Sequence, residues 1–181
     1  MSERTLVAHP SATPTVALGV VARAERVGTA LSLHYRLAGD LPRVALPPPA
    51  RGVRTDRLWE HTCFEAFVGF EGHEHYVEIN FSPSTAWAAY AFDGYRLGMR
   101  TLPLEQPPVV EVAREARALT VTGSVDLAAL SDARSPWRVG LTAVVESADG
   151  AKSYWALRHA EKTPDFHRAA AFELRLTGQM R

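Results

Sequence analysis

Apolar and polar residues alternate with a period of two over most of this sequence. In residues 29–37, for example, Leu31, Leu33 and Tyr35 are apolar and the residues between them are polar. Side chains of a β-strand point alternately to the two faces of a sheet, so this pattern predicts strands with one buried face. The pattern recurs in 63–70, 75–81, 119–125, 137–146 and 172–176, and shorter strands are expected at 16–22, 87–92, 109–113 and 153–157.

Turn sequences that contain glycine separate the alternating segments. Glu71–Glu74 and Ala148–Ala151 each lie between two such segments, which predicts a β-hairpin at both places. The helical signal is thin, and we expect one short helix at Asp126–Leu130. The proline-rich stretches 46–57 and 102–108 are expected to be loops, because proline cannot donate to a sheet ladder. Together these signals predict an all-β antiparallel sandwich or barrel.

Composition and charge narrow the class of protein further. The 181 residues, 46% apolar and 22% charged, are typical of a soluble globular protein, and we expect a single domain spanning 1–181. Twenty basic residues balance twenty acidic ones, so no overall charge attracts nucleic acid or an anionic membrane. The basic stretch Arg43–Arg57 has no interleaved aromatic residues, which favours a solvated loop.

Cysteine content and the amino terminus indicate the cellular location. Cys63 is the only cysteine, which excludes an intramolecular disulfide and a thiolate-rich zinc site. The amino terminus lacks the apolar stretch of a secretory signal, and the longest apolar run, residues 16–22, is far shorter than the roughly 20 residues that span a bilayer. We therefore expect a cytoplasmic protein.

Two neighbouring predicted strands carry acids and an amide on what the alternation predicts to be the non-core face. Glu65 lies on the first strand, and Glu78 and Asn80 lie on the second. Aromatic residues surround them, notably Trp59 and Tyr76. Carboxylates and amides hydrogen-bond sugar hydroxyls while aromatic rings cover the C–H face of a sugar, so this set suits a polyhydroxylated ligand. From spacing alone, an ordinary solvated sheet face is the more common explanation.

A second cluster of polar and aromatic residues lies near the carboxyl terminus. It lies in or beside a predicted loop, where binding residues concentrate, although a strand end followed by a turn explains it equally well. Its members are Trp155, Arg158, His159, Asp165 and His167.

The motifs in both clusters resemble one known family. The segments Leu58-Trp-Glu-His-Thr-Cys-Phe-Glu-Ala-Phe, Tyr76-Val-Glu-Ile-Asn-Phe-Ser-Pro-Ser, Trp87–Arg96, Trp155-Ala-Leu-Arg-His and Pro164-Asp-Phe-His together resemble the bacterial DOMON-like domain proteins. That family is grouped with the DOMON and family 9 carbohydrate-binding module superfamily. The resemblance implies an immunoglobulin-like β-sandwich of about ten strands that binds a sugar or a haem.

The resemblance also implies roles for a few residues. Glu65 matches the strand glutamate that bonds ligand hydroxyls in sugar-binding members, and Asn80 matches the asparagine of the next strand. Trp59 and Trp155 lie near the positions at which those members hold a sugar ring between two aromatic residues. Trp59-Glu60-His61 stands where calcium-binding members carry paired aspartates, which speaks against a structural calcium, and no metal ligand is assigned.

Haem is the first alternative to a sugar, since some DOMON domains ligate iron through methionine and histidine. Met99 is the internal methionine for such a pair, and His61, His159 and His167 are the histidines best placed to join it. Lone methionines and histidines are usually structural or solvated, so the cofactor is left open.

An enzyme is the second alternative. Glu65 and Glu78 are two carboxylates on neighbouring strands, as in glycosidases, and His61 with Glu65 or His159 with Asp165 are candidate acid–base pairs. The sequence has no nucleophile elbow, phosphate loop, dinucleotide fingerprint or zinc-protease motif.

The sequence thus favours non-catalytic binding of a small polar ligand, carbohydrate ahead of haem, without a nucleic-acid or membrane partner and with an undetermined oligomeric state. The expected ligand-binding residues are Trp59, Glu60, His61, Glu65, Tyr76, Glu78, Asn80, Trp155, Arg158, His159, Asp165 and His167.

Overall fold

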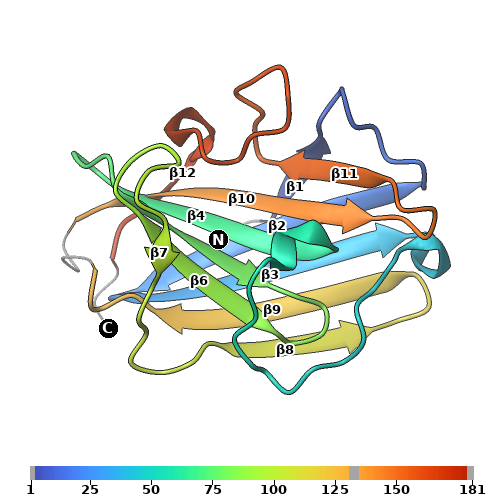
Figure 1. Cartoon of the computed structure of the whole chain (residues 1–181), viewed down its shortest axis with the longest axis horizontal. Helices are drawn as coiled ribbons and strands as arrows, with labels where there is room; N and C mark the ends of the chain where they lie inside the picture. Colours follow the sequence, from blue (N-terminus) through green and yellow to red (C-terminus); the bar gives the residue numbers. More distant parts are fainter. Residues whose placement is uncertain (1–2, 131–134, 179–181) are drawn as a thin grey trace.

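The computed structural model describes residues 3–130 and 135–178 (Figure 1). This part of the chain is all-β, with twelve strands that pair antiparallel and three single turns of 3₁₀ helix. The strands are β1 (Arg4–Ala8), β2 (Leu18–Val27), β3 (Ala30–Gly39), β4 (Cys63–Phe70), β5 (Tyr76–Phe81), β6 (Trp87–Phe92), β7 (Arg100–Thr101), β8 (Val109–Arg114), β9 (Ala118–Asp126), β10 (Trp137–Glu146), β11 (Lys152–Ala156) and β12 (Leu174–Leu176), and the 3₁₀ turns are η1 (Leu41–Arg43), η2 (Leu58–Glu60) and η3 (Ala169–Ala171).

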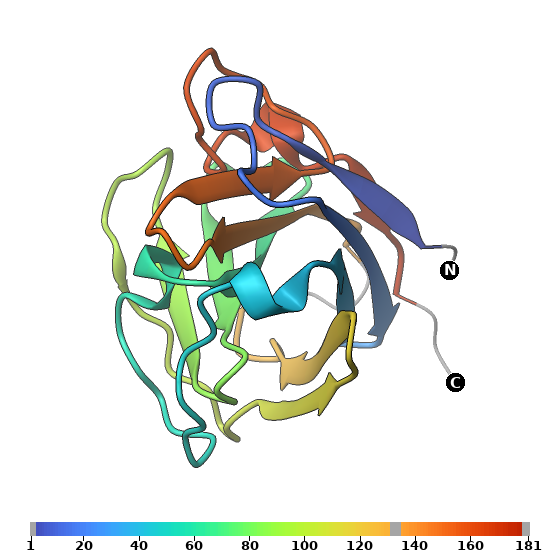
Figure 2. The ribbon, with the colours of Figure 1, turned by 90° about the vertical axis from the view of Figure 1, so that its right-hand side faces the viewer.

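The strands form one continuous sheet that curls into a half-barrel. Their hydrogen-bonded order is β7-β6-β5-β4-β10-β11-β1-β2-β3-β9-β8, and β12 pairs with β10. β1 joins the two halves, because its carboxyl end pairs with β11 and its amino end pairs with β2. In the view of Figure 2 the sheet curves around an interior, so strands distant in the pairing order face each other.

The interior of the curl holds the main apolar core. The rings of Tyr35 on β3 and Phe64 on β4 lie 5.2 Å apart between their centroids. Phe81 on β5 packs against the backbone of β9 so closely that a Cβ atom on Gly123 would lie 1.9 Å from its ring. The predicted alternation is confirmed here: Leu31, Leu33 and Tyr35 all point inward and are buried.

The half of the sheet that contains β4, β5 and β6 is buried on both faces. Every residue of β5 and β6 is buried, as is all of β4 except Gly69. On the face opposite the main core, Phe67 packs on Phe166 and Phe172, which lie in the segment between β11 and β12. The expectation that one face of these strands meets solvent is therefore wrong, because this segment covers it.

The strand and helix predictions are correct in outline and wrong in particular places. Both predicted hairpins are present, joining β4 to β5 and β10 to β11. The helix expected at Asp126–Leu130 is absent: Asp126 ends β9, its carboxylate accepts a hydrogen bond from the Ala128 amide, and residues 128–130 form a turn. The sequence showed no signal for β1 or for the two-residue β7. Among the described residues no helix has the length and apolar character needed to cross a membrane.

Candidate functional site

The outer face of the β4–β5–β10 region carries a row of polar side chains. Strand pairing sets Glu65 beside Asn80 on one side and beside Thr142 on the other. Thr142 Oγ1 donates to Glu65 Oε2 over 3.3 Å, and Asn80 Nδ2 donates to Glu78 Oε1 over 2.8 Å. The acids and the amide expected to share a sheet face therefore do so, and all of them are buried.

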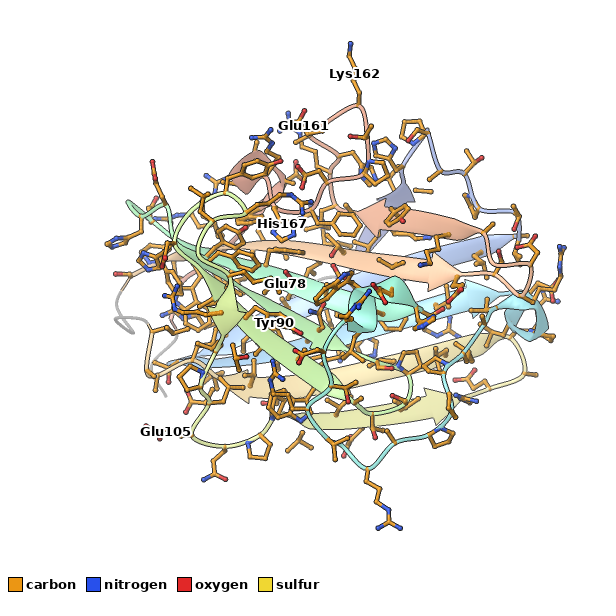
Figure 3. The ribbon with its side chains drawn as sticks, in the orientation of Figure 1. Glu78, Tyr90, Glu105, Glu161, Lys162 and His167 are labelled. Carbon is orange, nitrogen blue, oxygen red and sulfur yellow. The ribbon has the colours of Figure 1, made fainter. Side chains whose placement is uncertain are left out.

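Three segments lie over this row and border a half-open cavity of about 470 Å³. They are η2, the loop between β6 and β7, and the loop between β11 and η3. In Figure 3, His167 of the last loop and Glu78 of β5 lie close together where this loop meets the sheet. We call this space the cavity; its lining residues are Trp59, Glu60, Glu65, Phe67, Glu78, Phe92, Arg96, Met99, Val144, Lys152, Tyr154, Pro164, Phe166 and His167.

The two glutamates at the floor of the cavity hold protons more tightly than exposed carboxyl groups do. Burial raises the pKa of Glu65 well above its usual value, and the neighbouring charge of Glu78 raises it further. Burial also raises the pKa of Glu78, to about 6, against the opposing effects of the Asn80 hydrogen bond and the Arg96 charge. Both carboxyl groups therefore take up a proton more readily than an exposed glutamate does.

His167 is held neutral above this floor. Tyr76 Oη lies 2.8 Å from His167 Nδ1 and also accepts the Arg96 amide over 3.2 Å. We assign the Tyr76 hydroxyl proton to Nδ1, which leaves the proton of neutral His167 on Nε2, 3.9 Å from Glu78 Oε2. Burial, followed by the Arg96 charge, lowers the pKa of His167 to about 4. The ring thus presents an N–H donor on the side of the glutamates.

Asp165 fastens the two roof loops to each other. Its carboxylate accepts hydrogen bonds from Tyr95 Oη over 2.7 Å, from Arg96 Nη2 over 3.0 Å and from the His167 amide over 3.0 Å. Burial opposes its ionisation, but these hydrogen bonds and the Arg96 charge outweigh burial and lower its pKa. Asp165 is charged at neutral pH and fixes the positions of Arg96 and His167 at the cavity.

We expect Asp165→Ala to loosen the roof and to lower the free energy of unfolding by about 1–2 kcal/mol, because charge-assisted hydrogen bonds are lost. Amide hydrogen exchange should accelerate in residues 94–98 and 164–168. The control is Asp149→Ala, whose carboxylate bonds only within the turn between β10 and β11. Equal exchange in both variants at residues 94–98 would contradict a fastening role for Asp165.

The structure brings some of the expected site residues to the cavity and places others behind it. Trp59, Glu60, Glu65, Glu78 and His167 line the cavity directly. Tyr76, Asn80 and Asp165 do not line it, and each instead hydrogen-bonds a residue that does.

Four of the expected residues lie elsewhere, each for a specific reason. Trp155 points to the opposite face of β11, where it is buried in the main core and donates to Ser153 Oγ. His61 is exposed and lies 2.7 Å from a Glu146 carboxylate oxygen. His159 Nε2 lies 2.7 Å from the Val7 carbonyl oxygen, and Arg158 is exposed, 4.0 Å from Glu173. The pairing of Trp59 with Trp155 around a sugar ring is therefore not present.

Several lining residues were not singled out from the sequence. Tyr154, the neighbour of Trp155, takes the cavity side of β11, and Phe166 lies inside the Pro164–His167 motif. The period-two pattern allowed either Tyr154 or Trp155 to face outward, and strand register decides between them. Arg96 ends the Trp87–Arg96 segment of the resemblance but was not assigned to the site, and no signal in the sequence pointed to Lys152.

The described residues contain no grouped metal ligands, and the thiol of Cys63 is not activated. Within the ranges that the structure describes, no three His, Cys, Asp or Glu residues are grouped so as to hold a metal ion. Cys63 is buried, and burial followed by the charge of Glu65 raises the pKa of its thiol well above the usual value. A protonated, buried thiol is a poor nucleophile.

Comparisons with known proteins bear on the fold. No protein-family model matches the sequence, and no curated protein matches it. A proposed carbohydrate-binding protein from Bacteroides uniformis superposes with a TM-score of 0.74 at 16% identity, covering 98% of this chain and 86% of its own. A family 9 carbohydrate-binding module from Caldicellulosiruptor kristjanssonii, in complex with cellotriose, gives a TM-score of 0.61 at 9% identity, with 99% and 83% covered. A family 9 module from the same organism, in complex with glucose, gives a TM-score of 0.55 at 8% identity. The alignment covers 93% of this chain and 81% of the module. The chain thus has the fold of family 9 carbohydrate-binding modules.

Proposed function

We propose that this protein is a non-catalytic binding module that holds a small carbohydrate in the cavity. The observation that carries the proposal is the coincidence of buried carboxyl groups with aromatic walls in one roofed space. Sites for small ligands have this composition, with a few placed polar groups in a mostly apolar and aromatic lining. The volume of about 470 Å³ lies within the range of such sites.

The proposal extends to the family. We infer that the curled sheet is a variant of the immunoglobulin-like sandwich, and that the chain is a DOMON-like relative of family 9 carbohydrate-binding modules. The support is the similarity to modules solved with cellotriose and with glucose, together with the placement of Glu65 and Asn80 on adjacent strands.

A sugar-binding screen tests this function. Thermal shift and isothermal titration calorimetry against glucose, galactose, mannose, cellobiose and cellotriose, and against the amino and N-acetylated forms of the hexoses, should identify at least one sugar that binds at one site per chain and raises the Tm. The bound sugar should be recovered intact. A folded protein that binds none of them would contradict the proposal.

Haem does not fit the residues at the cavity. Met99 and His167 both line it, whereas His61 and His159 do not. The floor includes two buried carboxyl groups, and a porphyrin face laid over them would bring them no further hydrogen-bond donor. Nε2 of His167 is moreover directed at Glu78 rather than at open space.

A carboxylate-dependent hydrolase is the second candidate function, and one observation favours it. Burial and the charge of Glu78 raise the pKa of Glu65 well above its usual value, which suits the proton-donating carboxyl group of a glycosidase. The same screen separates the two functions, because a hydrolase would return cleaved cellobiose or cellotriose and would lose that activity in Glu65→Gln.

A further inference from the structure

The two carboxyl groups at the floor of the cavity lack a cationic partner of their own. The exposed fractions of Glu65 and Glu78 are 2% and 4%. In the described ranges neither forms an ion pair with lysine or arginine, and His167, 3.9 Å from Glu78, is neutral. Buried carboxylates are normally compensated by a cation or by several hydrogen-bond donors. The chain itself supplies too little of either.

Glu65 shows this deficit at a single atom. Its Oε2 accepts a hydrogen bond from Thr142, but its Oε1 is buried and has no hydrogen-bond partner in the part of the chain that the structure describes. Buried polar atoms without a hydrogen-bond partner are rare in folded proteins, so this oxygen is a candidate for a hydrogen bond to a bound molecule. Because Glu65 lines the cavity, a ligand in the cavity is the partner within reach.

The charged groups at the rim compensate the two glutamates only in part: the Arg96 charge lowers the pKa of Glu78 but does not return it to its usual value. Arg96 is ion-paired with Asp165 at 3.0 Å, and Glu60 is ion-paired with Arg57. Lys152 lines the cavity from the end of β11 without an ion pair to either floor glutamate. The titratable, charged and hydrogen-bonding groups near the two glutamates are Tyr35 on β3, Cys63 on β4, Tyr76 and Asn80 on β5, Thr142 on β10, Arg96 and His167 on the roof loops, and Glu60 and Lys152 at the rim.

The walls of the cavity suit a cation as well. Trp59, Phe67 and Phe92 line it together with Tyr154 and Phe166. The faces of aromatic rings attract ammonium groups, and sites for such groups combine rings with carboxylates. A sugar hydroxyl offers one donor proton, whereas a protonated amine offers three and a positive charge.

We infer that the ligand of this cavity carries a protonated amino group that binds between Glu65 and Glu78. This inference rests on the proposed function: if the ligand is a sugar and carries an amino group, it is an amino sugar. The ammonium group would supply the donor that Glu65 Oε1 lacks and the charge that Glu78 lacks.

Because Glu65 and Glu78 take up protons, the affinity for an amino sugar should depend on pH. Both have raised pKa values, so an empty cavity holds a proton that an incoming ammonium group displaces. Affinity for an amino sugar should therefore rise with pH through the titration of the glutamates. The affinity should fall again above about pH 8, where the amino group loses its own proton. A neutral sugar lacks this rise.

The test uses matched sugars on the wild-type protein. Glucosamine, galactosamine and mannosamine are each compared by calorimetry with the parent hexose and with the N-acetyl derivative. In the triplet that binds, we expect the amino sugar to bind at least about tenfold more tightly than the other two, as a charge-assisted bond predicts. Equal affinity for amine and hexose overturns this inference and leaves sugar binding intact; binding of none overturns the proposed function itself.

Variants assign the preference to the two glutamates. Glu65→Gln and Glu78→Gln keep the size of the side chain and remove the charge, so the ratio of amine to hexose affinity should fall at least about fivefold in each. The control is Glu105→Gln, an exposed glutamate that Figure 3 shows far from Glu78 and His167, and its ratio should equal that of the wild type. An unchanged ratio in both floor variants overturns the inference.

Discussion

Replacing Glu65 with alanine is expected to weaken the binding of the cavity's sugar by about 1–3 kcal/mol, or roughly tenfold to a hundredfold. The carboxyl group of Glu65 lines the cavity, and its Oε1 has no hydrogen-bond partner among the described residues. Removing it deletes a hydrogen bond and leaves the ligand's polar group buried without a partner. Titration calorimetry with the sugar that binds most tightly in the screen measures the loss.

The control for this experiment is Glu105→Ala. Glu105 is exposed on the loop that precedes β8 and has no place in the cavity, so the variant removes the same side chain without touching the floor. Its affinity should match that of the wild type. If the affinity of a folded Glu65→Ala protein also matches, Glu65 does not contact the ligand.

The hairpins of the fold can be predicted from the sequence, because the conformation of a short turn depends on the few residues that form it. The hairpin turns at Gly72 and Gly150 adopt φ angles of 86° and 84°, which glycine tolerates best. A short hairpin also fixes the register of its strands, so Glu65 and Asn80 were expected together and are paired. These contacts involve residues close in sequence.

The roof of the cavity depends on contacts between residues far apart in sequence, which the pattern does not encode. Arg96 and Asp165 lie on separate loops and meet only because β6 and β11 belong to the same half of the curled sheet. Alternation in β4 and β5 indicates two faces, but it does not reveal that a distant loop buries the second one. The expected solvent-facing acids are consequently buried, and their pKa values are raised.

The alternation of apolar and polar residues also cannot predict which of two adjacent aromatic residues faces the core. Tyr154 and Trp155 are adjacent, so one of them must face the core and the other the cavity. Their composition gives no reason to prefer either. The pairing of Ala143 with Trp155 and of Val144 with Tyr154 decides it, because Val144 lies on the cavity side of β10.

His167 should make the folded protein sensitive to acid. Its pKa is about 4 in the folded protein against an ordinary value of 6.5, so the unfolded chain takes up a proton at a pH where the folded protein does not. The stability that neutral His167 contributes is complete above pH 6.5 and is lost as the pH falls towards 4, a loss of about 3 kcal/mol. His167→Phe keeps an aromatic ring and cannot titrate.

The titration of Glu78 changes the free energy of unfolding with pH in the opposite direction to that of His167, so the two residues can be told apart. The Glu78 pKa of about 6 exceeds the ordinary 4.5, so its contribution to stability is complete below pH 4.5 and is lost as the pH rises through 6, by about 2 kcal/mol. Glu78→Gln removes this dependence. Relative to the wild type, the His167→Phe protein should gain stability as the medium is acidified, and the Glu78→Gln protein should lose it.

Urea unfolding of the wild type and both variants across the range from about pH 4 to about pH 8 measures these two trends. Comparing each variant with the wild type cancels the titration of groups elsewhere in the chain. If the difference between wild type and His167→Phe is independent of pH, His167 takes up its proton as easily in the folded protein as in the unfolded chain. The ring would then be in contact with solvent, and the loop between β11 and η3 would not cover Glu78 in solution.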